Sequence, residues 1–136
     1  MKIEFPLAYS WFIVKGLTAV EPWYFIDTKE SIMETPNWLK KEYFNKAFCI
    51  ETGADFEVYL FASRQDREDF AFFLVRNGKI EDKVITCHLS FSGKRELVDP
   101  YREEEINHTF MSWMKDIVLN DIAEWITEED LIEEYE

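Results

Sequence analysis

Cys87 and His88 are neighbours in the sequence, and a thiol beside an imidazole is the pairing of a cysteine nucleophile with its general base. The run from Ile85 to Phe91 alternates apolar and polar residues, which predicts a β-strand with one buried face and one wet face. Because neighbours in a strand point to opposite faces, the two side chains cannot act together as a dyad. We therefore expect Cys87 in the core and His88 on the surface.

The other groups with catalytic or metal-binding chemistry are few. The chain has two histidines and two cysteines, with no Cys-x-x-Cys or His-x-x-x-His spacing for zinc, and His108 stands beside a helix start, where a polar residue is ordinary. No glycine-rich phosphate loop and no Gly-x-Ser-x-Gly elbow occurs. We expect no metal, no cofactor and no enzymatic activity. The competing class is a small hydrolase or metal-dependent enzyme that uses carboxylates around His88.

Acidic residues dominate the charge. The net charge of −13 comes from 28 acidic and 15 basic residues, so nucleic acid and anionic membranes would be repelled, whereas a basic protein partner is allowed. The candidate residues for such a partner are acids in polar runs and two tryptophans as aromatic anchors: Glu103, Glu104, Glu105, Glu128, Glu129, Asp130, Glu133, Glu134, Trp11 and Trp38. A merely solvated acidic surface is an equally good interpretation of these carboxylates.

The central stretch, residues 56–91, predicts three antiparallel strands over 56–62, 70–76 and 84–91. In the first strand Phe56, Val58, Leu60 and Ala62 share one face and Tyr59 and Phe61 share the other. The second strand is apolar on both faces, so both sides of the sheet should be covered. A polar turn at 64–69 and an Asn-Gly turn at 77–78 separate the strands.

Helices and short strands flank this stretch. Residues 6–15 predict a short helix that buries Tyr9, Phe12 and Ile13, and residues 22–26 predict a strand. A brief helix is expected from Asp27 to Met33, a second one after Thr35-Pro36, and a short strand at 48–50. Apolar residues at helical spacing predict a long C-terminal helix over 109–126, capped by Thr109 or Asn107.

These elements predict an α+β fold in a single domain, residues 1–136, with helices packed on an antiparallel multi-stranded sheet. Cys49 and Cys87 are expected inside strands as reduced apolar fillers, which is typical of a cytoplasmic protein. No apolar run approaches the ~20 residues needed to span a bilayer, so we expect no membrane association. We expect a monomer or a weak dimer.

Three segments carry a resemblance to a known family. They are Phe5-Pro6-x-x-Tyr9-x-x-Phe12-Ile13 with Lys15-Gly16-Leu17 and Pro22-Trp23-Tyr24-Phe25-Ile26, then Thr52-Gly53-Ala54-Asp55-Phe56 leading into a strand, then Phe110-x-x-Trp113-Met114. In this order they resemble the SUKH superfamily, which includes yeast cell-wall-synthesis regulators and many bacterial immunity proteins. The resemblance implies a non-enzymatic domain that binds proteins, in bacteria often a cognate toxin such as a nuclease. A regulatory protein-interaction scaffold is the alternative that it leaves open.

Overall fold

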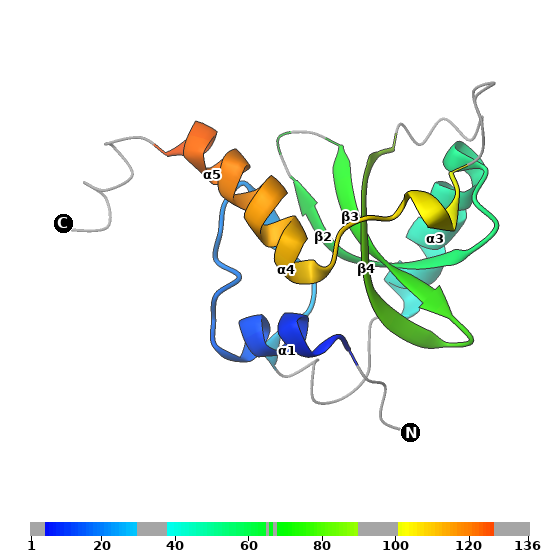
Figure 1. Cartoon of the computed structure of the whole chain (residues 1–136), viewed down its shortest axis with the longest axis horizontal. Coiled ribbons are helices and arrows are strands. Elements are labelled where there is room, and N and C mark those ends of the chain that lie inside the picture. The colour runs from blue at the N-terminus through cyan, green and yellow to red at the C-terminus, as the bar shows by residue number, and fades with distance from the viewer. Residues whose placement is uncertain (1–4, 30–37, 65, 67, 90–100, 127–136) are drawn as a thin grey trace.

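The computed structural model describes residues 5–29, 38–64, 66, 68–89 and 101–126, with the backbone alone for residues 38–41 and Trp125. The helices are α1 (Leu7–Val14), α3 (Trp38–Thr52), α4 (Phe110–Trp113) and α5 (Leu119–Trp125), together with the 3-10 turn η1 (Glu103–Glu105) and the π-helical segment η2 (Met114–Val118). The strands are β1 (Trp23–Phe25), β2 (Glu57–Arg64), β3 (Asp69–Arg76) and β4 (Lys79–His88). The fold is α+β, as predicted (Figure 1).

The strands form one antiparallel sheet in the order β1-β2-β3-β4, so each lies beside its neighbour in the sequence. This meander confirms the three predicted central strands. Asn77 and Gly78 both have positive φ angles, 53° and 76°, as the tight hairpin requires. Because that turn is only two residues long, Arg76 pairs with Lys79 and β4 begins there. The predicted start of this strand at residue 84 is therefore wrong.

One register irregularity changes which side of the sheet a residue faces. The pairing of β2 with β3 shifts between Leu60 and Ala62. Ala62 consequently joins the core cluster that contains Tyr59 and Phe61, whereas Val58 and Leu60 belong to the cluster on the other face. The predicted face of Ala62 is wrong, because strict alternation holds only in the absence of such a bulge.

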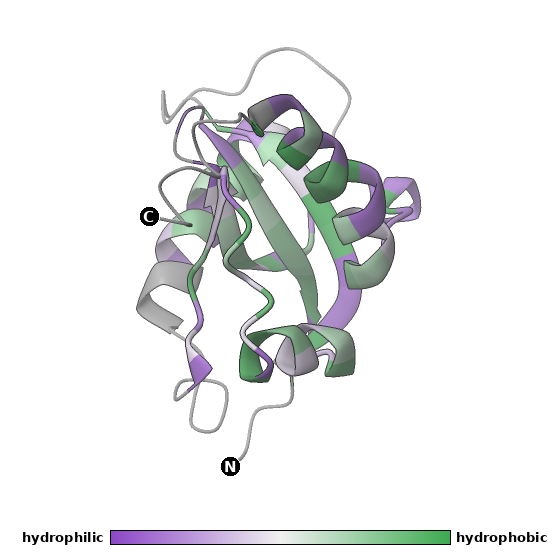
Figure 2. Ribbon diagram, turned by 90° about the vertical axis from the view of Figure 1, so that its left-hand side faces the viewer, coloured by the Kyte–Doolittle hydropathy of each residue, from purple (hydrophilic) through white to green (hydrophobic). Residues whose placement is uncertain are grey.

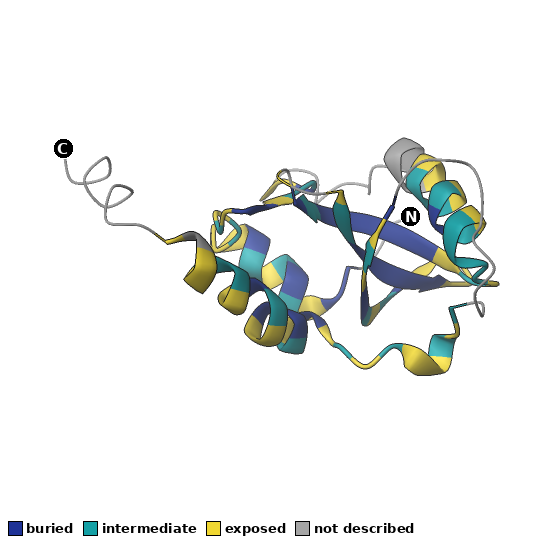
Figure 3. Cartoon of the chain, turned by 90° about the horizontal axis from the view of Figure 1, so that it is seen from above, coloured by how far each residue is buried: buried dark blue, intermediate teal, exposed yellow. Residues whose placement is uncertain are grey.

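Helices cover both faces of the sheet, as the apolar strands predicted. On one face Tyr9 of α1 and Phe110 and Trp113 of α4 pack against β2 and β3, and on the other face Phe48 of α3 packs against the opposite side of the same strands. The sheet lies between α3 and the helical path from α4 to α5 both in the side view and in the view from above (Figures 2 and 3). The prediction that the C-terminal helix packs across one face is confirmed.

The predicted strand at Phe48, Cys49 and Ile50 is wrong, because these residues belong to α3. A run of three apolar residues fits a strand or a helix equally well. In the structure Phe44, Ala47 and Phe48 contact the same core cluster, and this spacing of three and four residues is helical. Cys49 is therefore a helical residue and does not lie in a strand.

Thr109 begins the C-terminal helix, and its hydroxyl oxygen accepts a hydrogen bond of 3.2 Å from the backbone N–H of Ser112. The helical path then continues through α4, η2 and α5, so the predicted helix over 109–126 is confirmed. Of the two predicted caps, Thr109 is the one used. The segment η2 is a wider turn, in which the backbone bonds span one residue more than in an α-helix.

Two expectations fall on residues outside the description. The brief helix from Asp27 to Met33 depends on residues 30–33, and Phe91 lies in the range 90–100. In the described ranges of the chain, no helix has the length and apolar character needed to cross a bilayer.

Candidate functional site

The helix α1 is apolar on its outer face as well as on its inner one. Tyr9 and Ile13 are buried, but Leu7, Trp11 and Val14 are exposed by 85%, 52% and 39%. Spacings of four and three residues place these three side chains on one face of the helix, and we call them the α1 stripe. The helix beside the N-terminal trace is accordingly coloured as mostly hydrophobic in Figure 2. A helix that is apolar all round is ordinarily buried on all sides, so this one presents a surface suited to a partner.

A buried polar cluster fixes α1 against the sheet. Tyr9 and Tyr59 both donate hydrogen bonds to the carboxylate of Asp27, which is 5% exposed; the bond from Tyr59 is 2.8 Å long. Burial, and then the negative charge of Asp27, raises the pKa of Tyr9 well above its ordinary value of 10.0. Tyr9 therefore stays a neutral donor, and the cluster holds the inner face of α1 in one position.

Trp11 is exposed, as its predicted role as an anchor requires. Its ring centroid lies 5.9 Å from the ring of Phe12 and 5.9 Å from Nζ of Lys15, which lies over the indole. Phe12 in turn contacts Phe110 of α4 with a centroid separation of 5.2 Å. The exposed indole is thus backed by rings that belong to the core.

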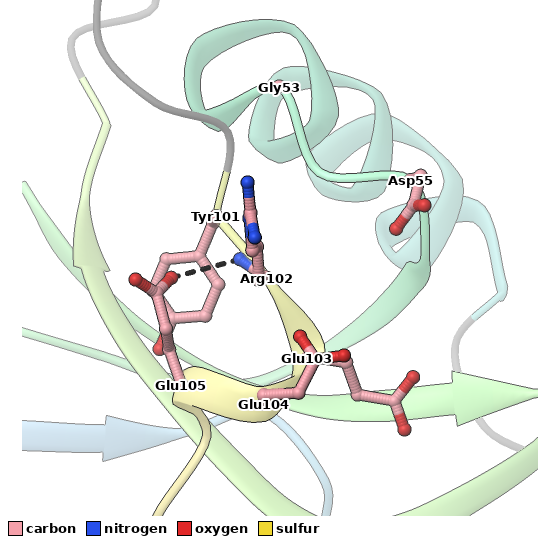
Figure 4. A pocket seen from close by; sticks show the side chains of 7 residues that line it. All are labelled: Gly53, Asp55, Tyr101, Arg102, Glu103, Glu104 and Glu105. Atoms are coloured by element: carbon pink, nitrogen blue, oxygen red, sulfur yellow. Dashed lines mark hydrogen bonds between the residues drawn. The ribbon is translucent and has the colours of Figure 1, made fainter.

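A second surface feature is an open pocket of about 610 Å³ beside η1, which we call the η1 pocket. Gly53 and Asp55 line it from beyond the end of α3, and residues 101–105 line it from the other side (Figure 4). The lining holds four carboxylates and one guanidinium, that of Arg102, so the pocket is acidic. A cationic side chain is the ligand chemistry that suits such a lining.

Backbone contacts between distant segments create this pocket. The N–H of Tyr101 donates to the carbonyl oxygen of Thr52 over 3.0 Å, which attaches the segment before η1 to the end of α3. The Tyr101 ring packs 6.2 Å from Phe48 and 6.2 Å from Phe56, and its burial raises the pKa of its hydroxyl. The pocket therefore joins residues about fifty positions apart.

The three predicted glutamates of η1 differ in their contacts. Glu103 forms ion pairs with Arg76 and with Lys83, the second over 3.4 Å, and Glu105 accepts a 2.9 Å bond from the backbone N–H of Arg102. Glu104 is exposed and has no ion-pair partner among the described residues, and the same holds for Asp55. Glu104 and Asp55 are therefore the carboxylates of the pocket that remain open to a cation.

The remaining predicted site residues cannot be placed beside these. Glu128, Glu129, Asp130, Glu133 and Glu134 lie outside the described residues, and of Trp38 only the backbone, at the start of α3, is described.

The α1 stripe and the η1 pocket do not form one surface. Tyr9 of α1 belongs to the core cluster on one face of the sheet, whereas Tyr101 and Ile106 pack against the cluster on the other face. The sequence reasoning missed Leu7, Val14 and Asp55. The spacing of Leu7 and Val14 around Trp11 was readable, but Asp55 joins the site only through the tertiary pairing of Tyr101 with Thr52.

The geometry around the cysteine and the first histidine agrees with the predicted strand. Cys87 packs against the core, where burial raises the pKa of its thiol to about 12, and the side chain of His88 is 62% exposed with Nδ1 3.4 Å from Asp69. The two residues face opposite sides of β4. Neither His88 nor Asp69 lines the η1 pocket.

A serine, a histidine and an aspartate meet at the start of the C-terminal helix, which the sequence reasoning did not foresee. Nδ1 of His108 lies 3.2 Å from Oγ of Ser112 and 3.9 Å from Asp116. A catalytic triad needs the hydroxyl and the carboxylate on opposite ring nitrogens, and here both approach the same one. This cluster therefore lacks the geometry of a charge relay, and the hydroxyl of Ser112 serves the helix cap instead.

In the part of the chain that the structure describes, no group of three or more histidine, cysteine, aspartate or glutamate side chains is arranged to hold a metal ion. Comparisons with family models, with curated proteins and with solved structures found no match for this chain.

Proposed function

We propose that this protein is a non-enzymatic protein-binding domain that acts as an immunity protein, neutralising a cognate toxin by direct association. The observation that carries this proposal is the α1 stripe, in which Trp11 stands exposed between Leu7 and Val14 on a helix held rigidly from behind. Tryptophan is the residue type most enriched among the side chains that dominate protein interfaces. Fully burying the exposed side chain of Leu7 beside Trp11 removes apolar surface worth about 1.5 to 3 kcal/mol from water.

The charge of the chain favours a basic partner. With a net charge of −13, the protein attracts cationic domains at long range, and a toxin that acts on nucleic acid carries such a basic surface. Charge complementarity mainly accelerates encounter, while apolar anchors such as Trp11 set how long the complex lasts. Glu104 and Asp55 in the η1 pocket, which have no ion-pair partner among the described residues, supply carboxylates for this steering.

The likeness to the SUKH superfamily supports the same class of function and is part of the proposal. A regulatory scaffold of the kind found in that superfamily would bind a different partner, also through exposed apolar anchors and complementary charge. The identity of the partner separates the two: a toxin whose activity is abolished on binding indicates immunity, and a partner that keeps its activity indicates a scaffold.

The test begins with the protein encoded by the neighbouring gene, purified and titrated calorimetrically with this protein at about 50 mM and about 500 mM salt. We expect binding, inhibition of the toxin, and weaker binding at high salt. Trp11→Ala should weaken binding roughly 30-fold or more, the cost of losing a central aromatic anchor. The matched control is Leu119→Ala on α5, a residue exposed to a similar degree, which should leave the affinity unchanged.

A neighbouring toxin that neither binds nor is inhibited would overturn the immunity proposal. Tight binding that Trp11→Ala leaves unchanged would show instead that the partner uses a surface other than the α1 stripe.

A further inference from the structure

The strand β4 forms one edge of the sheet, and its backbone groups alternate in direction. The N–H of Val84 points away from β3 and donates to the carbonyl oxygen of His108 over 2.8 Å, whereas the N–H of Leu89 points inward and donates to the carbonyl oxygen of Glu68 over 3.0 Å. Val84 and Leu89 are an odd number of residues apart, so these two hydrogen bonds together fix the direction of each backbone group between them. The N–H and C=O groups of Thr86 and His88 therefore point outward, away from β3.

These outward groups have no partner within the described ranges. The only described backbone segment on this edge is the one that ends at His108, and it pairs with β4 at Val84 alone. The residues Thr86 and His88 are both exposed. Two N–H and two C=O groups thus have the geometry of a strand edge and no hydrogen-bond partner among the described residues.

The opposite edge of the sheet is protected against the addition of a further strand. The edge strand there, β1, is only three residues long, and beyond it the outward N–H of Val58 is satisfied by Oδ1 of Asn45 on α3 at 2.8 Å. Short edge strands and side-chain caps are the means by which proteins prevent further strands from adding to a sheet. The described part of β4 has no such protection at Thr86 and His88.

We propose that the open edge of β4 at Thr86 and His88 binds an extended, basic segment of the partner protein, which adds to the sheet as a further strand. This inference rests on the proposed function for the basic character of the partner, but it assigns a second contact surface. Main-chain hydrogen bonds supply affinity in this mode of recognition, and alternate side chains supply specificity.

Carboxylates around this edge select for positive charge. Glu51 and Asp69 both lie close enough to Cys87 for their negative charges to raise the pKa of its thiol. The charge of Glu105 likewise raises the pKa of the hydroxyl of Tyr101. The nearby cation Lys83 is engaged by Glu103, and the imidazole of His88 faces Asp69. Lysine or arginine side chains on one face of an added strand would therefore meet carboxylates.

Position 88 offers a clean pair of variants for the test. In His88→Pro the ring replaces an outward N–H that makes no sheet hydrogen bond, so the fold is retained while one bond to an added strand is lost. The matched control, His88→Ala, removes the same imidazole and its contact with Asp69 but keeps the N–H. Thr86 is left unchanged, because its hydroxyl accepts a 2.8 Å bond from the indole of Trp113.

The probe is a capped peptide of alternating lysine and valine, about ten residues long, compared with its glutamate-valine counterpart. We expect the basic peptide to slow amide hydrogen exchange at Thr86 and His88, and the acidic peptide to have no such effect. His88→Pro should weaken binding of the basic peptide about tenfold or more, and His88→Ala should stay within about twofold of the wild type.

Unchanged exchange at Thr86 and His88 at saturating peptide would overturn the proposal, as would equal binding by His88→Pro and the wild type. The exchange measurement on the wild type decides the matter even if His88→Pro fails to fold. Failure here is distinguishable from failure of the proposed function: a toxin that binds through Trp11 but gives no protection at these amides removes only the edge contact.

Discussion

The indole N–H of Trp23 donates a hydrogen bond of 2.7 Å to the carboxylate of Asp121, 98 positions later in the sequence. The same carboxylate lies 3.2 Å from Nη1 of Arg64, a side chain that is only 6% exposed and that also pairs with Asp66. One carboxylate thereby connects β1, the end of β2 and α5. Arg64, the first residue of the predicted polar turn, is consequently buried, whereas Asp66 and Glu68 of the same turn are exposed.

Asp121→Ala should destabilise the protein by about 2 to 3 kcal/mol, because it leaves the buried indole N–H without an acceptor and one side of a buried guanidinium without a counter-charge. Urea denaturation measures this change. Glu124→Ala, an exposed position on the same helix, should change the stability by less than about 0.5 kcal/mol. Equal effects of the two substitutions would contradict a structural role for the carboxylate.

The buried Tyr9 predicts a loss of stability in alkali. Its pKa is raised in the folded protein above the ordinary value of 10.0, so the unfolded chain releases this proton first. The stability that Tyr9 contributes is therefore complete below pH 10.0 and falls above it by about 1.4 kcal/mol per pH unit. Tyr9→Phe should be less stable near neutrality, since Asp27 loses a donor, but should show a shallower decline above pH 10.0.

Urea titrations between about pH 9 and pH 11 test this difference in slope. They should be made in a Cys87→Ala background, because the thiol has the same sign of linkage, from its ordinary value of 9.0 to about 12. If the free energy of unfolding fell with the same slope against pH in the Tyr9→Phe variant as in the protein that keeps Tyr9, the hydroxyl at position 9 would not be shielded in the folded protein.

Cys87 should resist alkylation while the protein is folded. With its pKa at about 12, roughly one thiol in ten thousand is ionised at about pH 8, and only the thiolate reacts. Iodoacetamide labelling followed by mass spectrometry, on a Cys49→Ser variant that leaves one cysteine, should show slow modification that becomes fast in urea. Rapid labelling in buffer would mean that burial does not protect this thiol.

Glu104→Lys should slow association with a basic partner by a few-fold at low salt, because it places a cation in the η1 pocket beside Asp55. Stopped-flow kinetics at low and high salt measure this, and the effect should vanish at high salt. Glu124→Lys makes the same change in net charge away from the pocket and should have the smaller effect. Equal rates for the two variants would assign the steering to net charge alone.

Local sequence signals predicted the elements that depend on local physics. The Asn77-Gly78 turn, the apolar strands on either side of it and the helical spacing after Thr109 are each legible within a few residues, and each was confirmed. The start of β4 was placed too late because the first residues of this strand are mostly polar and do not alternate as a strand with one buried face does. Their pairing with β3 follows from the two-residue turn. The run at 48–50 was misassigned because three apolar residues do not distinguish a strand from a helix.

The parts that could not be read from the sequence depend on long-range contacts. The η1 pocket exists because the backbone of Tyr101 bonds to that of Thr52. The polar contacts of Trp23 and Arg64 exist because both side chains meet the carboxylate of Asp121. Asp27 carried a cap signal in the sequence, yet its carboxylate accepts hydrogen bonds from two tyrosines in the core. Such pairings follow from where the elements meet, which no local pattern encodes.

The π-helical segment η2 sets the rotational phase of everything that follows it. A turn with one extra residue delays the helix by about 100° relative to an uninterrupted α-helix, and Asp121 stands three residues beyond the end of that turn. Closing η2 to ordinary α-helical pitch without removing a residue would turn Asp121 by about 100°, away from Trp23 and Arg64, whereas deleting one residue within Met114–Val118 at the same time would cancel that rotation. The spacing between Trp113 and Asp121 therefore fits this fold only together with the wide turn, which absorbs the one residue that an uninterrupted α-helix would not need.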